Sequence, residues 1–317
     1  MRNRSAQISF QLLGFSIIPQ LQVMLFFIFL AIYILTVLAN ITIIMLVRVD
    51  HRLHSPMYLL LGHLSFLEIW YTSTIVPKLL ANLMQNKTIS LPGCLTQIYF
   101  YFSLGSTEFF LLGLMAVDRY LAICNPLHYA IIINGRVCLQ ATTACWSVAF
   151  VAVFFLVILI SQLPFCGTEV NHFFCDIPPL LRLCCLDTQV VEKVVFLFAC
   201  FIILSSFLVT IISYVFIIST ILKISSTKGR HKTFSTCASH FTVVVILYGT
   251  VIFIYVRPSV AYALDINKVV GLLNTVVTPL LNPIIYCLRN KEVKEAQKKL
   301  LKKLAHLSWK GTTHPIT

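Results

Sequence analysis

Charged residues are scarce in this chain of 317 residues. Only 11% of the residues are charged, whereas 58% are hydrophobic, and the mean hydropathy is +0.89. A soluble globular domain needs more polar surface than this composition supplies. The composition therefore excludes an ordinary soluble domain and predicts an integral membrane protein.

Sequence motifs for catalysis and for nucleotide binding are also lacking. The chain has no G-x-S-x-G nucleophile elbow, no glycine-rich phosphate-binding loop and no paired histidines at metal-binding spacing. We therefore expect neither an enzyme nor a metal site built on histidines.

Residues 1–20 lack the charged and then apolar segment of a cleaved signal peptide, and we expect none. The sequon Asn3-Arg4-Ser5 makes Asn3 a candidate glycosylation site. A second sequon, which begins at Asn40, lies within an apolar run and should not be modified.

Long apolar runs recur along the chain at a length that can span a bilayer. We place seven of them at residues 21–47, 56–83, 94–123, 137–163, 194–222, 234–256 and 268–288. The predicted fold is an all-α bundle of seven transmembrane helices over 21–288. An N-terminal segment, 1–20, precedes it, and a tail, 289–317, follows it.

The distribution of Lys and Arg predicts the orientation of this bundle. If the N-terminus is extracellular, fifteen basic residues face the cytoplasm and eight face outside. Since cytoplasmic segments carry the basic excess, the N-terminus should be extracellular and the C-terminus cytoplasmic. The net charge of +13 then reflects topology and attraction to anionic lipid, and nucleic-acid binding is not needed to explain it.

The tail begins RNKEVKEAQKKLLKKLAHL, with Val293, Leu300, Leu301 and Leu304 among the lysines. This pattern predicts a short amphipathic helix on the inner leaflet. A solvated basic tail is the alternative.

Five cysteines are predicted on the outer side: Cys94, Cys166, Cys175, Cys184 and Cys185. An oxidising compartment favours disulfides among them, with one thiol left over, but sequence alone does not give the pairing. His172 lies near Cys175, yet one His-Cys pair lacks the ligands of a stable metal site.

Two acids, Glu68 and Glu108, lie inside predicted spans, where ionisable side chains are costly and are functional candidates. At a helical rise of about 1.5 Å per residue, both lie roughly 16 to 18 Å from the cytoplasmic face. Asn40 and Asn282 lie roughly 10 to 12 Å from that face. These four residues predict either a cation site or a proton-sharing polar cluster. A proton-coupled transporter would also use such acids, but it should show repeated or matching broken helices.

Pro279 and Pro283 lie within the last span. Each removes a backbone donor, so the helix should bend there and leave carbonyls free for other partners.

One stretch, MAVDRYLAICNPLHY at 115–129, resembles the cytoplasmic end of the third helix in rhodopsin-like G-protein-coupled receptors, and olfactory receptors in particular. Val117 occupies a place where the usual family form has tyrosine. Further blocks are similar to the same family: Ser213-Tyr214, KTFSTCASH at 232–240, and Asn282-Pro283 with Tyr286. Ordered blocks thus carry the resemblance from about residue 40 to residue 290.

The resemblance implies an odorant receptor of the plasma membrane that couples to a stimulatory heterotrimeric G protein and raises cyclic AMP. It implies the pairs Cys94–Cys175 and Cys166–Cys185, with Cys166–Cys184 as an open alternative. It also implies a sodium-linked site near Glu68 and Glu108. The residues it assigns to G-protein coupling and activation are Asp118, Arg119, Tyr120, Tyr214, Tyr248, Asn282, Pro283 and Tyr286.

A ligand pocket is expected in the outer half of the bundle. Tyr101, Phe102, Gly105 and Ser106 lie at spacings that we assign to one face of the third helix, with a notch at the glycine. The other expected contacts are Phe198, Ile202, Val251, Ile252, Tyr255 and Leu272. Such walls suit a small, neutral, apolar ligand. The alternatives are helix-packing core at any one position and, for function, a rhodopsin-like receptor for a non-odorant ligand.

Overall fold

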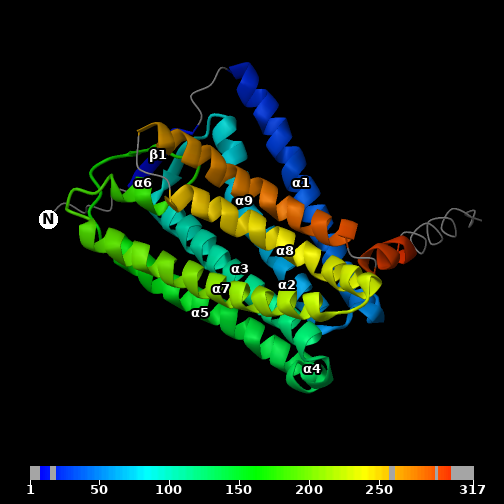
Figure 1. Cartoon of the computed structure of the whole chain (residues 1–317). Coiled ribbons are helices and arrows are strands. Elements are labelled where there is room, and N and C mark those ends of the chain that lie inside the picture. The colour runs from blue at the N-terminus through cyan, green and yellow to red at the C-terminus, as the bar shows by residue number, and fades with distance from the viewer. Residues whose placement is uncertain (1–7, 15–18, 257–260, 290–291, 301–317) are drawn as a thin grey trace, which may run out of the picture.

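The computed structural model describes residues 8–14, 19–256, 261–289 and 292–300. Seven long helices run side by side through the molecule (Figure 1). They are α1 (Pro19–Val49), α2 (Pro56–Leu83), α3 (Leu91–Cys124), α5 (Gly135–Ser161), α7 (Gln189–Lys223), α8 (Thr227–Val256) and α9 (Ala261–Arg289). The short helices are η1 (His51–Leu53), α4 (Pro126–Ile132) and α6 (Ile177–Leu181).

Each predicted span coincides with one long helix, so the predicted seven-helix class is confirmed. Five of the helices, α1, α2, α3, α5 and α7, are long and apolar enough to cross a membrane by themselves. In α8 and α9 the described side chains form the apolar stretches Cys237–Val251 and Val269–Ile285.

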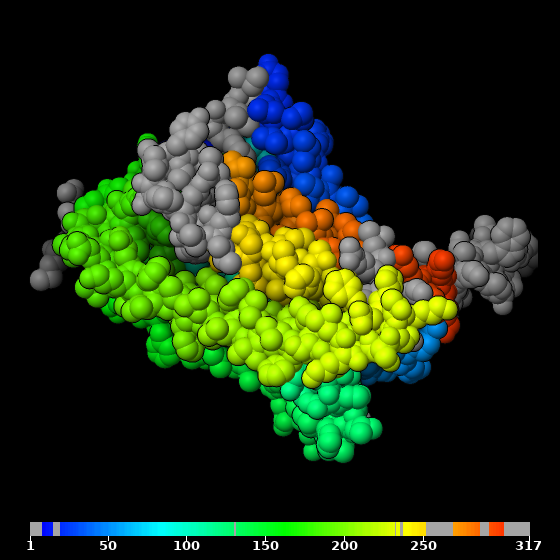
Figure 2. Space-filling view, viewed as in Figure 1, coloured from blue at the N-terminus to red at the C-terminus, as the bar shows by residue number. Residues whose placement is uncertain are grey.

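Burial separates central from peripheral helices. In α2 and α3, 56% of the most apolar stretch is buried inside the protein, against 11% in α1 and 17% in α7. The outward side chains of α7 are large and apolar, including Phe196, Phe201 and Leu208. Figure 2 shows α7 and α8 lying across one face of the molecule. In a membrane protein, such exposed apolar surface contacts lipid.

Local capping explains where several helices begin. Ser90 precedes α3, and its hydroxyl accepts a hydrogen bond from the Gly93 N–H. Asn134 caps α5 in the same way by accepting from the Val137 N–H at 3.0 Å. These side chains satisfy amide groups that have no partner within the first turn.

A small three-stranded sheet at one end of the bundle was not expected. β1 (Ser9–Leu12) lies between β2 (Thr88–Ser90), to which it is antiparallel, and β3 (Glu169–Val170), to which it is parallel. Phe10 and Leu12 are fully buried beneath the loops. Residues 9–12 therefore form part of the core, which was not predicted for the N-terminal segment 1–20. Asn3 lies outside the described residues.

The tail packs on the opposite end of the bundle. Residues 292–300 are helical, and Val293 and Ala296 are buried in the core formed by α1, α2 and α3. The Tyr58 hydroxyl donates to Glu292 at 2.6 Å, and Arg52 lies 3.5 Å from Glu295. Two carboxylates thus hold the helix against α2 and η1. Leu301 and Leu304 lie outside the described residues.

Candidate functional site

The long loop between α5 and α7 is tied to the bundle by two disulfides, Cys94–Cys175 and Cys166–Cys185. This is the pairing that the resemblance implied. Cys184 has a free thiol, and its backbone pairs with that of Phe165. Partial burial raises the pKa of the Cys184 thiol, which disfavours the reactive thiolate.

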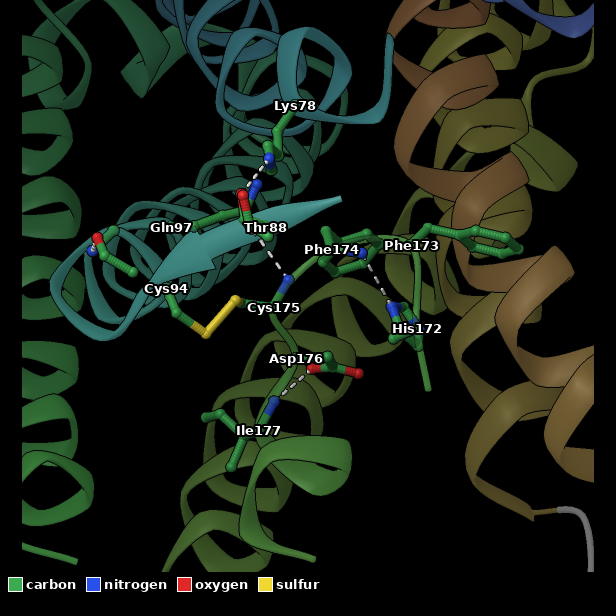
Figure 3. Close-up of a disulfide and its surroundings, with 12 residues drawn as sticks. Lys78, Thr88, Cys94, Gln97, His172, Phe173, Phe174, Cys175, Asp176 and Ile177 are labelled. Carbon is green, nitrogen blue, oxygen red and sulfur yellow. Dashed lines mark hydrogen bonds between the residues drawn. A yellow bond between two sulfur atoms is a disulfide. The ribbon is translucent and has the colours of Figure 1, made fainter. Parts of the chain in front are cut away.

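Polar bonds around the first disulfide fix the loop over α3 (Figure 3). The Gln97 side chain accepts from the Cys175 N–H at 2.9 Å and donates to the Thr74 carbonyl of α2 at 3.0 Å. Asp176 accepts from the Ile177 N–H at 2.8 Å at the start of α6. Burial raises the pKa of Asp176, although this hydrogen bond favours its charged form. The residues next to Cys175 therefore have a defined position above the bundle.

Directly below this loop, an aromatic wall joins α2, α3 and α9. The Tyr101 ring stacks on Tyr71 at a centroid distance of 5.3 Å and contacts Phe174 at 5.0 Å. The Tyr71 and Tyr101 side chains also interact with each other and with Thr275 of α9. Leu272 is buried in the same cluster as Phe174.

The four residues expected on one face of α3 divide between two directions. A Cβ built on Gly105 would lie 3.8 Å from the Tyr71 ring, so Gly105 faces α2 with Tyr101. Phe102 packs against the core below the disulfide, as Phe198 of α7 also does. Ser106 is buried. The reason is angular: at about 100° per residue, positions 101 and 106 point roughly 140° apart around the helix.

A second wall lies between α3, α7 and α8. The Tyr248 hydroxyl donates to Ser206 Oγ at 2.8 Å, and its ring lies 5.4 Å from Phe109 and 5.1 Å from Phe207. Ile202 and Val251 are buried. The side chains of Ile252 and Tyr255, which we also expected at the ligand, lie outside the described residues.

Sequence reasoning missed several members of these walls. Tyr71, Phe174, Ser206 and Thr275 come from four different segments and carry no motif that distinguishes them from packing residues. The one available signal was the position of Phe174 next to Cys175, because a disulfide to α3 brings its neighbours over the bundle.

Deeper in the bundle, the four polar residues predicted to converge are all buried. Asn282 donates its side-chain N–H to Glu68 Oε1. Glu68 and Glu108 interact electrostatically. Three oxygens among these residues, Asn40 Oδ1, Glu68 Oε2 and Glu108 Oε1, have no hydrogen-bond partner in the described part of the chain. Hard cations bind oxygen ligands, so this donor set fits a cation such as sodium.

Pro283 explains how Asn40 is held in this cluster. A proline has no N–H, so the Pro279 carbonyl, four residues earlier, loses its helical donor. Asn40 Nδ2 donates to that carbonyl at 3.1 Å. The free carbonyl expected from the sequence therefore joins α9 to α1. The Tyr286 side chain lies outside the described residues.

At the opposite end of the bundle, the acid and base of the DRY segment pair with each other. Arg119 Nη2 lies 2.7 Å from Asp118 Oδ2, and both side chains are largely buried. The Tyr129 hydroxyl of α4 donates to Asp118 Oδ1 at 2.7 Å. Burial and this hydrogen bond to a carboxylate raise the pKa of Tyr129. Arg119 is therefore engaged within its own helix.

Nearby, α7 and α8 are joined by a buried hydrogen bond. The Tyr214 hydroxyl lies 2.7 Å from His240 Nδ1, and the two rings are stacked. The Tyr120 ring lies 5.6 Å from Phe216 of α7. His240 falls within a block that the sequence identified, but only the structure pairs it with Tyr214.

Known proteins match the chain over nearly its whole length. A family model described as "Olfactory receptor" matches residues 29–304. Human olfactory receptor 6F1 is 55% identical over 311 residues, which cover 98% of each chain. Rat olfactory receptor 287 is 51% identical over 303 residues, covering 95% of this chain and 97% of its own. Human olfactory receptor 11L1 is 48% identical over 310 residues, covering 97% and 96%.

These matches include every block that carried the resemblance, and the helical bundle is the fold that the family requires. The chain therefore belongs to the olfactory receptor family, multi-pass G-protein-coupled receptors of the plasma membrane that respond to odorants, and it is not an enzyme.

Proposed function

We propose that this receptor binds small, neutral, mostly apolar volatile odorants between the two walls in the disulfide-bearing half of the bundle. The observation that carries the proposal is the chemistry of those walls. They consist of aromatic and aliphatic side chains with a few hydroxyls, and none of the side chains named there is charged. Binding would then come mainly from removing apolar ligand surface from water, at roughly 25 cal/mol per Å².

The hydroxyl groups of the walls would give the site its selectivity. Tyr248 and Ser206 already bond to each other, so a ligand oxygen could replace one partner of that bond. A hydrocarbon could not, and it would have to leave the bond intact. Odorants with an alcohol, aldehyde or ketone group should therefore depend on Ser206 more than hydrocarbons do.

The disulfide-bearing end is extracellular in this proposal, with the N-terminus outside and the C-terminus in the cytoplasm. The excess of basic residues on the opposite side supports this orientation. Two disulfides at one end also suit an oxidising compartment. Asn3 would then be accessible for glycosylation.

Signalling would start from the Arg119 pair. In the present arrangement Arg119 is bound to Asp118, and Tyr214 is bound to His240. An odorant that binds better to a second arrangement of α3, α7 and α8 would shift the population toward it. We propose that Arg119 then leaves Asp118 and contacts a stimulatory heterotrimeric G protein, which raises cyclic AMP.

A cyclic AMP reporter assay across an odorant panel tests this proposal, with surface display measured by an N-terminal epitope tag. Ser206→Ala should weaken responses to hydrogen-bonding odorants about tenfold, which corresponds to roughly 1.4 kcal/mol. Ser205→Ala is the matched control, because the Ser205 hydroxyl donates to the Ile202 carbonyl of its own helix and has no other partner among the described residues.

Two results would contradict the proposal. Activation by charged ligands alone would show that the ligand class is wrong and would favour a non-odorant receptor. Responses that reach a different G-protein reporter without cyclic AMP would show that the coupling is wrong.

The buried oxygens of Asn40, Glu68 and Glu108 are proposed to hold a sodium ion. Two adjacent buried acids repel each other when both are ionised, so a cation or a shared proton must compensate them. Melting of purified receptor in sodium chloride and in choline chloride separates the two cases. Sodium should raise the Tm of wild type but not of Glu108→Gln, whereas a shared proton predicts the same Tm in both salts.

A further inference from the structure

An open groove of about 430 Å³ lies between α2 and α3, outside both walls of the odorant site. Its polar end is formed by Lys78, Thr74 and Thr96, and its apolar end by Trp70 and Phe100. Thr96 is exposed, and Phe66, which contacts Trp70, is 51% exposed. The groove therefore opens toward the membrane and not toward the centre of the bundle.

Lys78 gives this groove an uncompensated positive charge. Its ammonium donates to the Asn86 carbonyl at 2.9 Å and to the Thr88 carbonyl at 2.6 Å, and Figure 3 shows it directed toward Thr88. An ammonium has three donors, so one of them has no partner among the residues that the structure describes. In the described part of the chain no carboxylate lies within ion-pair distance of Lys78. The vacant donor and the unmatched charge both favour an anionic group.

The other end of the groove is aromatic. Trp70 lies 5.3 Å from Phe100 and stacks on Trp146 of α5 at 6.1 Å. Eight residues of α2 separate Trp70 from Lys78, which places the aromatic end about 12 Å along the helix. Lys78 lies near the end of α2, so the groove runs from headgroup level into the hydrocarbon region. A cation at one end and an aromatic surface at the other match an amphiphile that stands parallel to the helices.

We propose that this groove binds one membrane glycerophospholipid, with its phosphate on Lys78 and an acyl chain along Trp70 and Phe100. A sterol would present only a neutral hydroxyl to Lys78 and would leave the charge unmatched. A phosphate accepts a charge-assisted hydrogen bond, which is stronger than a neutral one. Assignment of the lipid to the outer leaflet rests on the orientation proposed above, whereas the binding itself does not.

Because Lys78 also holds the loop before β2, a bound phospholipid would contact the segment that pairs with β1. It would therefore stabilise the sheet over the disulfide-bearing end, in addition to filling the groove. This effect supplies a second readout, the Tm of purified receptor as phospholipid is added.

The test is native mass spectrometry of purified full-length receptor in detergent, titrated with phosphatidylcholine or with diacylglycerol of the same acyl chains. Wild type should retain one phosphatidylcholine and bind diacylglycerol about tenfold more weakly. Lys78→Gln should weaken phosphatidylcholine binding to the level of diacylglycerol binding. The glutamine amide keeps a donor for the loop but has no charge. Lys78→Arg should restore binding. Lys193→Gln, an exposed cation outside the groove, is the matched control and should bind like wild type.

Thr96→Trp supplies a variant that leaves Lys78 and the loop intact. The tryptophan should fill the groove from its exposed rim and weaken phosphatidylcholine binding. The yield of purified receptor should stay unchanged. The proposal would be overturned if wild type bound both lipids equally. It would also be overturned if Lys78→Gln bound phosphatidylcholine as tightly as wild type does. If the receptor instead retains cholesterol, and does so equally in wild type and in Lys78→Gln, the proposal is wrong and the groove is a sterol site. None of these outcomes depends on the odorant, so failure here leaves the receptor function untouched.

Discussion

Substitution of Gly105 tests whether the aromatic wall of α2 and α3 contacts the odorant. A Cβ at this position would lie 3.8 Å from Tyr71 Cε2, which is an ordinary van der Waals distance, so Gly105→Ala should fit. Valine adds two γ carbons about 1.5 Å further out, beyond the space that the Tyr71 ring leaves. Such overpacking costs about 1 to 3 kcal/mol. The Tyr71 ring cannot move freely, because it stacks on Tyr101.

The assay is a cyclic AMP dose-response curve with surface display measured in parallel. Gly105→Val should raise the half-maximal odorant concentration at least tenfold, roughly 1.4 kcal/mol in apparent affinity. Gly105→Ala should leave it nearly unchanged, since alanine also favours the helix by about 1 kcal/mol. Display of both variants should stay near wild type. If Gly105→Val leaves the dose-response curve of every active odorant unchanged, the ligand does not bind against this wall.

The remaining predictions concern signalling and assembly. Arg119→Ala should abolish odorant-dependent cyclic AMP at normal surface display, because the proposed G-protein contact is lost, and normal signalling would refute it. Cys94→Ser and Cys175→Ser should each abolish display, whereas Cys184→Ser should be nearly silent because that thiol is free, and loss of display in flow cytometry would contradict this. Phe10→Ala should cost about 3 kcal/mol or more and reduce display, since its ring is fully buried; wild-type display and Tm would show that β1 is dispensable.

Sequence was sufficient wherever a fixed physical length governed the result. The bilayer sets the length of a span, so apolar runs located the seven helices to within a few residues at most ends. The helical rise is also constant, so counting residues placed Glu68 and Asn282 within reach of each other, and the structure joins them by a hydrogen bond. The missing N–H of Pro283 predicted a free carbonyl in the same way, although not that Asn40 would bind it.

The tertiary structure decided what depends on the rotation and crossing of helices. Apolar residues surround a transmembrane helix on all sides, so periodicity does not tell which of them face the centre of the bundle. The sequence therefore did not separate Gly105 and Tyr101, which face Tyr71, from Phe102, which packs against the core below the disulfide. The pairing of Tyr214 with His240 likewise required the packing of α7 against α8.

Burial of the N-terminal strand also came only from the structure. Four residues, Ser9–Leu12, are too short for a pattern to distinguish a strand from a polar tail. β1 exists because β2 and β3 supply its hydrogen-bond partners, and the disulfide Cys94–Cys175 holds the loop that carries β3. Sequence by itself therefore determined the class, the spans and the depth of the polar cluster in this receptor. Contacts between distant segments decided its ligand walls and the cover over them, because such contacts depend on packing that no local pattern encodes.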